Sequence, residues 1–192
     1  MTPRLIERHP AAYELLIRAR SGRHFNERMQ AVAAEVPPAS SVVELCCGPG
    51  TLYTHYLRDG VSSYVGLDVN ERFVASLRRR GVDARPMDLS NSREPIPSAD
   101  VVIIQDALHK FLPDPAHIVD RMLAAARRLV VVAEQVRTPG SAGPLRRLVA
   151  VGTSERLTGE LLDQLFEPYR ELLVKTTALP GGHEKLYVLR AG

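Results

Sequence analysis

Aromatic residues are scarce in this chain: tryptophan is absent, and Phe, Trp and Tyr together make up 5% of the residues. Proteins that bind single-stranded nucleic acid need aromatic side chains on which bases stack, so this class is disfavoured. The formal net charge is only +3, and the basic clusters at 78–80, 127–128 and 146–147 are short. These arginines are typical of a solvated surface, and we expect no DNA partner.

Cysteine is almost absent too. Cys46 and Cys47 are adjacent, so on a strand they would point to opposite faces and cannot form an ordinary structural disulfide. No Cys/His spacing suggests zinc, and we expect no metal. The chain also lacks a secretory signal pattern and any run of eighteen apolar residues. We therefore expect a reduced cytoplasmic protein that does not enter a membrane, while its oligomeric state stays open.

What is present is an alternation of strand and helix patterns. With 192 residues and 45% hydrophobic content, the chain can form one domain over residues 1–192. We expect an N-terminal helical cap (1–38), a core (40–137) and a C-terminal part of the sheet (138–192). The alternation predicts an α/β fold, a Rossmann-like doubly wound sheet. It should be mostly parallel with an antiparallel C-terminal strand, and helices should cover both faces. Expected strands are 41–46, 63–68, 82–86, 99–105, 127–135, 169–177 and 184–190; expected helices are 11–36 with a break at 21–22, 51–60, 70–81, one opened by Asp114, and 158–166.

One segment has no periodicity. Residues 136–147, VRTPGSAGPLRR, are rich in Gly and Pro and are typical of a long surface loop. Tyr13, His24 and Phe25 belong to the N-terminal helical part. We expect that part and the loop to form a lid over a ligand site.

The most informative segment is 41–50, SVVELCCGPG. An apolar strand enters a turn that contains Gly48 and Gly50, and a second strand ends on Asp68 about twenty residues later, which is the layout of a nucleotide-binding βαβ unit. A dinucleotide site needs a third glycine three residues after Gly50, but that position is Tyr53. The pattern therefore favours S-adenosylmethionine over NAD.

Ligands in such sheets lie beyond the carboxyl ends of the strands. Asp68 can accept charge-assisted hydrogen bonds from both ribose hydroxyls. Asp88 follows the third strand and can accept from an adenine amino group, and Met87, Val69 or Leu89 can cover the ring. Each residue also has an alternative role without a ligand: Asp68 could cap the following helix, and Asp88 could form a turn.

The runs VVELCCGPGTL, GLDVN, DARPMDL, DVVIIQDALHKF and RRLVVVAEQV resemble, in order and spacing, the class I S-adenosylmethionine-dependent methyltransferase family over residues 40–137. The resemblance implies that Glu44, Gly48 and Gly50 line the methionine end of the cofactor. It implies further that Asp68 holds the ribose, Asp88 the adenine amino group, and Gln105 the stretch below the sulfonium. Cys46 stands where the family has its first glycine, and its side chain would narrow the cofactor pocket.

Methyl transfer requires an aligned acceptor and, for a hydroxyl or amine, a group that removes a proton. His109 is the candidate base because a neutral imidazole titrates near working pH. It could equally be a packing histidine. Asp106, Glu134 and Arg137 at the strand ends, together with Tyr13, are candidate acceptor-binding residues.

The acceptor is expected to be a small molecule, because the run QDAL lacks the Asn/Asp-Pro-Pro-aromatic motif of resembling enzymes that methylate nucleic-acid bases. S-Adenosylhomocysteine would be the product. Two alternatives stay open: a regulatory protein of the same fold that binds the cofactor without transfer, and a less favoured NAD(P)-dependent oxidoreductase.

Overall fold

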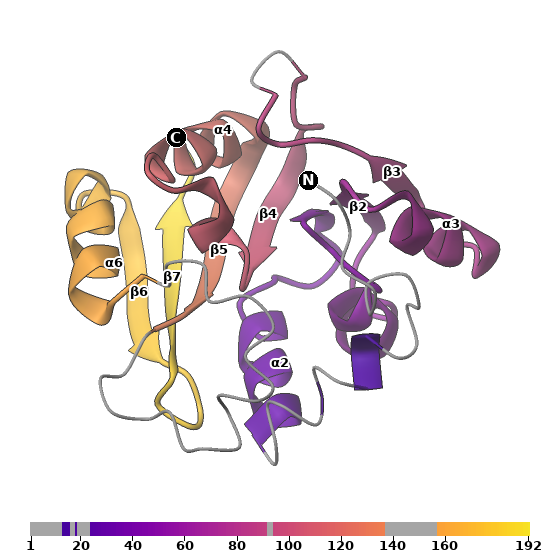
Figure 1. The fold of residues 1–192 in the computed structure, drawn as a ribbon, viewed down its shortest axis with the longest axis horizontal. Coiled ribbons are helices and arrows are strands. Elements are labelled where there is room, and N and C mark those ends of the chain that lie inside the picture. The colour runs from indigo at the N-terminus through magenta and orange to yellow at the C-terminus, as the bar shows by residue number, and fades with distance from the viewer. Residues whose placement is uncertain (1–12, 16–17, 19–23, 92–93, 137–156) are drawn as a thin grey trace.

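One twisted seven-stranded sheet organises the protein (Figure 1). The computed structural model describes residues 13–15, 18, 24–91, 94–136 and 157–192. The strand order is β3-β2-β1-β4-β5-β7-β6. Strands β1 to β5 pair in parallel, and β7 is antiparallel to both of its neighbours. The strands are β1 (Ser41–Leu45), β2 (Ser63–Asp68), β3 (Ala84–Pro86), β4 (Ala99–Gln105), β5 (Ala126–Gln135), β6 (Leu173–Ala178) and β7 (Glu184–Arg190).

This topology confirms the predicted doubly wound sheet with an antiparallel C-terminal strand. The predicted strand 169–177 begins later, at Leu173, because Glu167–Tyr169 form a short 3-10 helix, η5, that contains Pro168. Proline has no N–H to donate to a strand pairing.

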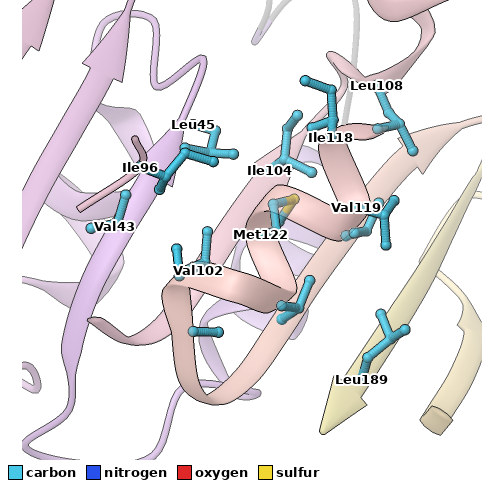
Figure 2. Close-up of a cluster of buried hydrophobic side chains, with 14 of the residues drawn as sticks. Val43, Leu45, Ile96, Val102, Ile104, Leu108, Ile118, Val119, Met122 and Leu189 are labelled. Atoms are coloured by element: carbon cyan, nitrogen blue, oxygen red, sulfur yellow. The ribbon is translucent and has the colours of Figure 1, made fainter. Parts of the chain in front are cut away.

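Helices cover both faces of the sheet, and the strand residues alternate between two buried clusters. On one face Val43, Val102 and Val130 pack with α4 (Ala116–Ala125) and α6 (Gly159–Phe166). Figure 2 shows Ile118, Val119 and Met122 of α4 against the strands. Met122 is fully buried, so its replacement by alanine would cost about 2–5 kcal/mol.

The second cluster lies on the other face, where Val42, Val101 and Val131 pack with α2 (Phe25–Ala33) and α3 (Glu71–Arg79). Helix α3 begins as predicted, since the Asn70 side chain accepts a hydrogen bond from the Arg72 N–H at 3.1 Å. Helix α6 begins in the same way at Thr158. Because both faces are covered, the middle parts of the central strands β4 and β5 are continuous apolar runs, at residues 101–104 and 129–133.

The helix expected at 11–36 agrees with the structure where its residues are described, since residues 13–15 and 18 are helical and α2 follows; the helix ends earlier than expected, at Ala33, and the expected break at 21–22 lies outside the described residues. The helix expected at 51–60 begins as predicted but continues as a π-helix, η3 (Tyr53–Leu57). Such π segments are frequent beside functional sites. Among the described residues no helix combines the length and the apolarity needed to cross a membrane.

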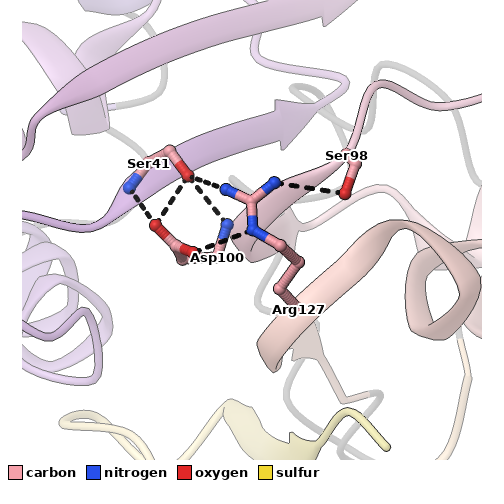
Figure 3. A network of polar contacts seen from close by, with 4 residues as sticks. All are labelled: Ser41, Ser98, Asp100 and Arg127. Carbon is pink, nitrogen blue, oxygen red and sulfur yellow. Dashed lines mark hydrogen bonds and ion pairs between the residues drawn. The ribbon is translucent and has the colours of Figure 1, made fainter.

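The amino ends of β1, β4 and β5 are joined by a polar network (Figure 3). The Asp100 carboxylate accepts from the Ser41 N–H at 2.8 Å, the Ser41 hydroxyl at 2.7 Å and the Arg127 Nε at 3.1 Å. Arg127 also donates to Ser98. Hydrogen bonds from the Ser41 backbone and side chain and from Arg127 lower the pKa of Asp100 to about 2. At this end of the sheet the charged groups of Asp100 and Arg127 therefore bond to each other.

The proposed loop at 136–147 lies outside the described residues beyond Val136. The lid expected there, and the candidate acceptor-binding residue Arg137, therefore stay predictions.

Candidate cofactor and acceptor site

The glycine turn lies at the carboxyl end of β1, where the strand order reverses between β1 and β4. Gly48 and Gly50 have φ angles of 54° and 74°, in the left-handed region that glycine adopts without strain. A Cβ on Gly50 would also lie 2.4 Å from Leu77 Cδ2 of α3. Gly50 therefore permits helix packing, whereas Gly48 faces the site.

Cys46 adopts the same left-handed conformation, with φ of 51°. A side chain in this conformation costs energy, and such residues cluster at functional sites. The partly buried thiol lies in the wall of a cavity. Burial raises the pKa of Cys46 to about 12, so the thiol is neutral at physiological pH.

A cavity that opens to solvent lies at this end of the sheet. Its floor is the glycine turn, and its far wall comes from α2 and the start of β7. The cavity is lined by Tyr13, Glu14, Phe25, Arg28, Met29, Glu44, Cys46, Cys47, Gly48, Pro49, Thr51, Leu52, Gln105, Asp106, Lys110, Ala133, Gln135 and Glu184.

Asp68 binds the glycine turn from the end of β2. Its Oδ2 accepts from the Gly48 N–H and its Oδ1 from the Asn70 N–H, both at 2.8 Å. Each carboxylate oxygen has a second lone pair, so these bonds leave capacity for ribose hydroxyls. Asn70, not Asp68, caps α3 through its side chain, which agrees with a ligand role for Asp68.

The residues expected around an adenine ring lie outside the cavity lining. Val69 is 56% exposed, an unusual state for a large apolar side chain beside buried Met87. Asp88 is exposed, and its Oδ1 accepts from the Ser90 N–H at 3.0 Å. Asp88 therefore makes the turn contact that the sequence offered as an alternative, and its adenine-binding role stays a prediction.

Glu44 is 4% exposed and belongs to the cavity wall. The Tyr64 hydroxyl donates to its Oε2 at 2.6 Å, and the Gln105 Nε2 donates to its Oε1 at 3.5 Å. Burial raises the pKa of Glu44 to about 7; these two hydrogen bonds lower it, and the charge of Asp68 raises it.

Three candidate residues meet at the ends of β4 and β5. Oxygen and nitrogen atoms of Asp106, His109 and Glu134 all lie within 4.8 Å of one another. His109 Nδ1 and Glu134 Oε1 are 2.7 Å apart, and Glu134 Oε2 accepts from the Leu108 N–H at 2.7 Å. Burial lowers the pKa of His109, but Glu134 and Asp106 outweigh it, and the net shift is upward.

This group could hold a metal ion by its composition. However, both oxygens of Glu134 already bond to the protein, which favours a His–Glu dyad over a pair of metal ligands. Of the three residues, Asp106 lines the cavity and His109 does not. Asp106 has a φ of 46° and accepts from the Gln135 Nε2 at 2.9 Å.

The structure adds residues that the sequence did not indicate. Arg28 of α2 donates to both carboxylate oxygens of Glu184 at the start of β7, with Nε to Oε2 at 2.6 Å. Lys110 also lines the cavity. Arg28 and Glu184 are 156 residues apart, so no local pattern could have paired them. Tyr13 and Phe25 line the cavity as expected, whereas His24 contacts Glu27 at 2.7 Å.

These features fit an adenosyl cofactor: a cavity at the switch point, a glycine turn on its floor, and a carboxylate at the end of β2. The third glycine of a dinucleotide site is replaced by Tyr53, whose ring stacks on Tyr64 with centroids 4.0 Å apart. The fold and site thus define a nucleotide-cofactor α/β protein of the methyltransferase type.

Comparison with known proteins supports the assignment to the methyltransferase type. Residues 42–131 match the family described as "Methyltransferase domain". A search of curated protein sequences finds no match. Similar solved structures include a chain from a complex of the Haloferax volcanii Trm112 methyltransferase activator with a methyltransferase, at 15% identity and a TM-score of 0.74, covering 100% of this chain and 99% of that one.

Two further structures have the same fold. A SAM-dependent methyltransferase from Aquifex aeolicus has 12% identity and a TM-score of 0.67, with coverage of 95% of this chain and 98% of that one. Magnesium protoporphyrin IX methyltransferase from Synechocystis PCC 6803, solved with bound SAH, has 13% identity and a TM-score of 0.61, with 96% and 84% covered.

The family match identifies residues 42–131 as a methyltransferase domain, and the sheet that contains them has the fold of the class I S-adenosylmethionine-dependent methyltransferases. The resemblance noted in the sequence is confirmed, and with it the enzyme class. The cofactor of this class is S-adenosylmethionine.

Proposed function

We propose that the protein transfers a methyl group from S-adenosylmethionine to a hydroxyl or amine of a small molecule. The observation that carries this proposal is the position of the Asp106–His109–Glu134 group. It stands at the ends of β4 and β5, and through Asp106 it reaches the cavity that also contains the glycine turn. A proton-accepting group and a cofactor site thus share one wall.

In the proposed complex the methionine part lies against Glu44 and Gly48, and Gln105 lies below the sulfonium. Asp68 holds the ribose, and Asp88, Val69 and Met87 hold the adenine. The bound cofactor supplies a methyl group already activated by its sulfonium. The protein therefore has to align the acceptor and remove its proton.

His109 is the proposed general base and Glu134 its positioning residue. If His109 Nδ1–H donates to Glu134, then Nε2 remains a proton acceptor. Asp106 lines the cavity and can accept a hydrogen bond from the O–H or N–H of the acceptor. The carboxylates of Glu134 and Asp106 also stabilise the imidazolium that forms after proton transfer.

A small acceptor suits the mixed lining of the cavity. Phe25 and Met29 offer apolar surface, and Arg28, paired with Glu184, offers N–H donors. Tyr13 and Asp106, which line the cavity, remain the proposed acceptor-binding residues from the sequence, whereas Glu134 is 1% exposed and outside the lining and acts through His109. Arg137 is proposed on sequence grounds alone.

A second candidate is a regulatory protein that binds the cofactor without methyl transfer. The observation in its favour is that the cavity lining of the described residues does not include His109. A partner that completes the site would reconcile both functions. The Haloferax volcanii protein, of the same fold, was solved with an activator, so we propose an activating partner as an option here.

The test combines binding and turnover. S-Adenosylhomocysteine should bind in calorimetry, and mass spectrometry should find a methylated product in a panel of phenols, alcohols and amines. His109→Asn should then lower kcat by about 10²–10⁴-fold with cofactor affinity unchanged. His117→Asn, a matched change at an exposed histidine, should leave turnover intact.

Cofactor binding with no product from any acceptor would favour the regulatory candidate. If S-adenosylhomocysteine does not bind at all, the proposed function is wrong. Activity of the wild-type enzyme should fall as pH decreases through the raised pKa of His109, because the imidazolium cannot accept a proton.

A further inference from the structure

A buried carboxylate in the cavity wall has no cationic partner among the described residues. Glu44 is 4% exposed, and its hydrogen-bond donors, the Tyr64 hydroxyl and the Gln105 amide, are neutral. An ionised carboxylate is costly in such surroundings unless an opposite charge neutralises it.

The groups that face Glu44 do not supply that charge. Tyr64 and Asp68 come from β2, Gln105 comes from β4, and the thiols of Cys46 and Cys47 come from the glycine turn. Asp68 repels a second negative charge, and both thiols are neutral because burial raises their pKa values. The cations that line the same cavity do not pair with Glu44: Arg28 is bound to Glu184, and Lys110 makes no ion pair with Glu44 among the described residues.

The protonated form is therefore favoured in the free protein. Burial raises the pKa of Glu44 to about 7, as described above. A carboxyl group with this environment is about half protonated near neutral pH.

We infer that Glu44 is protonated in the free protein, gives up its proton when S-adenosylmethionine or S-adenosylhomocysteine binds, and then pairs with the ligand's ammonium group. This inference rests on the proposed cofactor position. In the exchange the O–H bond of Glu44 breaks, its proton passes to solvent, and the carboxylate keeps the electron pair. Below the pKa of Glu44, binding of one cofactor molecule releases one proton.

The consequence is a cofactor affinity that depends on pH. Below the pKa of Glu44 in the free protein, the ligand must displace a proton, so the binding constant should rise about 10-fold per pH unit. Above that pKa the carboxylate is already ionised, and the affinity should level off. Binding would also distinguish ligands by the presence of an ammonium group.

The experiment is calorimetric titration of the full chain with S-adenosylhomocysteine at about pH 6 and about pH 8.5, on either side of the Glu44 pKa of about 7, in buffers of different ionisation enthalpy. Nearly one proton should be released at the lower pH and almost none at the higher. 5′-Methylthioadenosine lacks the amino-acid part of the cofactor. It should bind without proton release at either pH.

Three variants make the result specific to this side chain. Glu44→Gln should bind S-adenosylhomocysteine more weakly at the higher pH, without proton release and with affinity independent of pH. Tyr64→Phe removes a hydrogen bond that favours the ionised form, so it should move proton release to higher pH. Glu160→Gln, a matched change at an exposed position of α6, should behave as wild type.

If S-adenosylhomocysteine binds the wild-type protein without proton release at the lower pH, the inference is overturned while the proposed cofactor stands. The same holds if Glu44→Gln still releases the proton. If the ligand does not bind at either pH, the proposed cofactor position and the inference fail together.

Discussion

The carboxylates at the two ends of strands β1 and β4 have opposite electrostatic surroundings. At the amino ends, Asp100 is surrounded by donors from Ser41 and Arg127, and its pKa falls to about 2. At the carboxyl ends, Glu44 is buried with neutral donors, and its pKa rises to about 7. At the amino ends the charged groups bond to one another and join the strands. At the carboxyl ends Glu44 has no cationic partner among the described residues, and a cationic ligand would supply one.

This comparison predicts that carboxylates at the two ends affect different measurements. Changes at the carboxyl ends should alter ligand binding or its pH dependence. Changes at the amino ends should alter the free energy of unfolding and leave binding intact.

The largest effect is expected for Asp68→Ala. It removes the bond to the Gly48 N–H and would also remove the two proposed charge-assisted hydrogen bonds to the ribose, so the affinity for S-adenosylhomocysteine should fall by roughly 10²–10³-fold. Calorimetry measures this change. Asp68→Asn, which keeps the shape of the side chain, should lose less, and an affinity equal to wild type in both variants would contradict the ribose role.

Glu44→Gln should stabilise the free protein at high pH. Because the folded pKa of about 7 exceeds the ordinary value, ionisation of Glu44 opposes folding above pH 7, at a cost of up to about 3 kcal/mol. The stabilisation should therefore be full at about pH 8, decrease as pH falls from 7 towards the ordinary glutamate value, and be absent below it. Urea unfolding at both extremes measures it; equal stabilisation at both would show that ionisation is not its source.

Asp100→Asn should lower the unfolding temperature by a few degrees near neutral pH, because the side chain loses its charge opposite Arg127. The folded pKa of Asp100 is depressed, so its contribution is present above the ordinary aspartate value and is lost as pH falls towards 2. Thermal unfolding at several pH values measures this. Calorimetry should show unchanged binding of S-adenosylhomocysteine; weakened binding would break the division between the two ends.

Cys46→Gly should give the smallest effect, a gain in stability of about 1 kcal/mol from relief of the left-handed backbone. It should also widen the cavity, so the affinity for the cofactor should equal or exceed that of the wild-type protein. Ala39→Gly is the matched control, since Ala39 has a φ of 57° and is exposed outside the cavity. Ala39→Gly should gain similar stability with unchanged affinity, whereas a loss of affinity in Cys46→Gly would show that the thiol contacts the ligand.

The sequence predicted most of the fold because its local signals agree. Strand β4 occupies residues 99–105 as expected from an apolar run between polar loops, and α3 starts after Asn70 as its capping pattern indicated. The π-helix at Tyr53–Leu57 was missed. The local pattern there predicts a helix but does not distinguish an α-helix from a π-helix. The ring of Tyr53 stacks on Tyr64, which belongs to strand β2, and a contact between two elements has no local sequence signal.

The candidate site was predictable where it follows a strand end. Glu44, Cys46, Gly48, Gln105 and Asp106 all reach the cavity, since parallel strands end at one edge of the sheet. His109 was predicted beside the methyl group; its side chain bonds to Glu134 and lies outside the described cavity lining, so its role as a base stays a prediction. Its side chain direction depends on the turn after β4, which spacing alone does not reveal.

The sequence by itself determined the alternation of buried strands and helices, and the glycine turn with its acidic partner Asp68, because these rest on local conformation and chain reversal. Only the tertiary structure decided the order of the strands in the sheet, that Arg28 binds Glu184, that His109 pairs with Glu134, and that Glu44 has no cationic partner among the described residues. Charge pairing and desolvation depend on which distant groups share a cavity, and that is set by packing across the whole sheet.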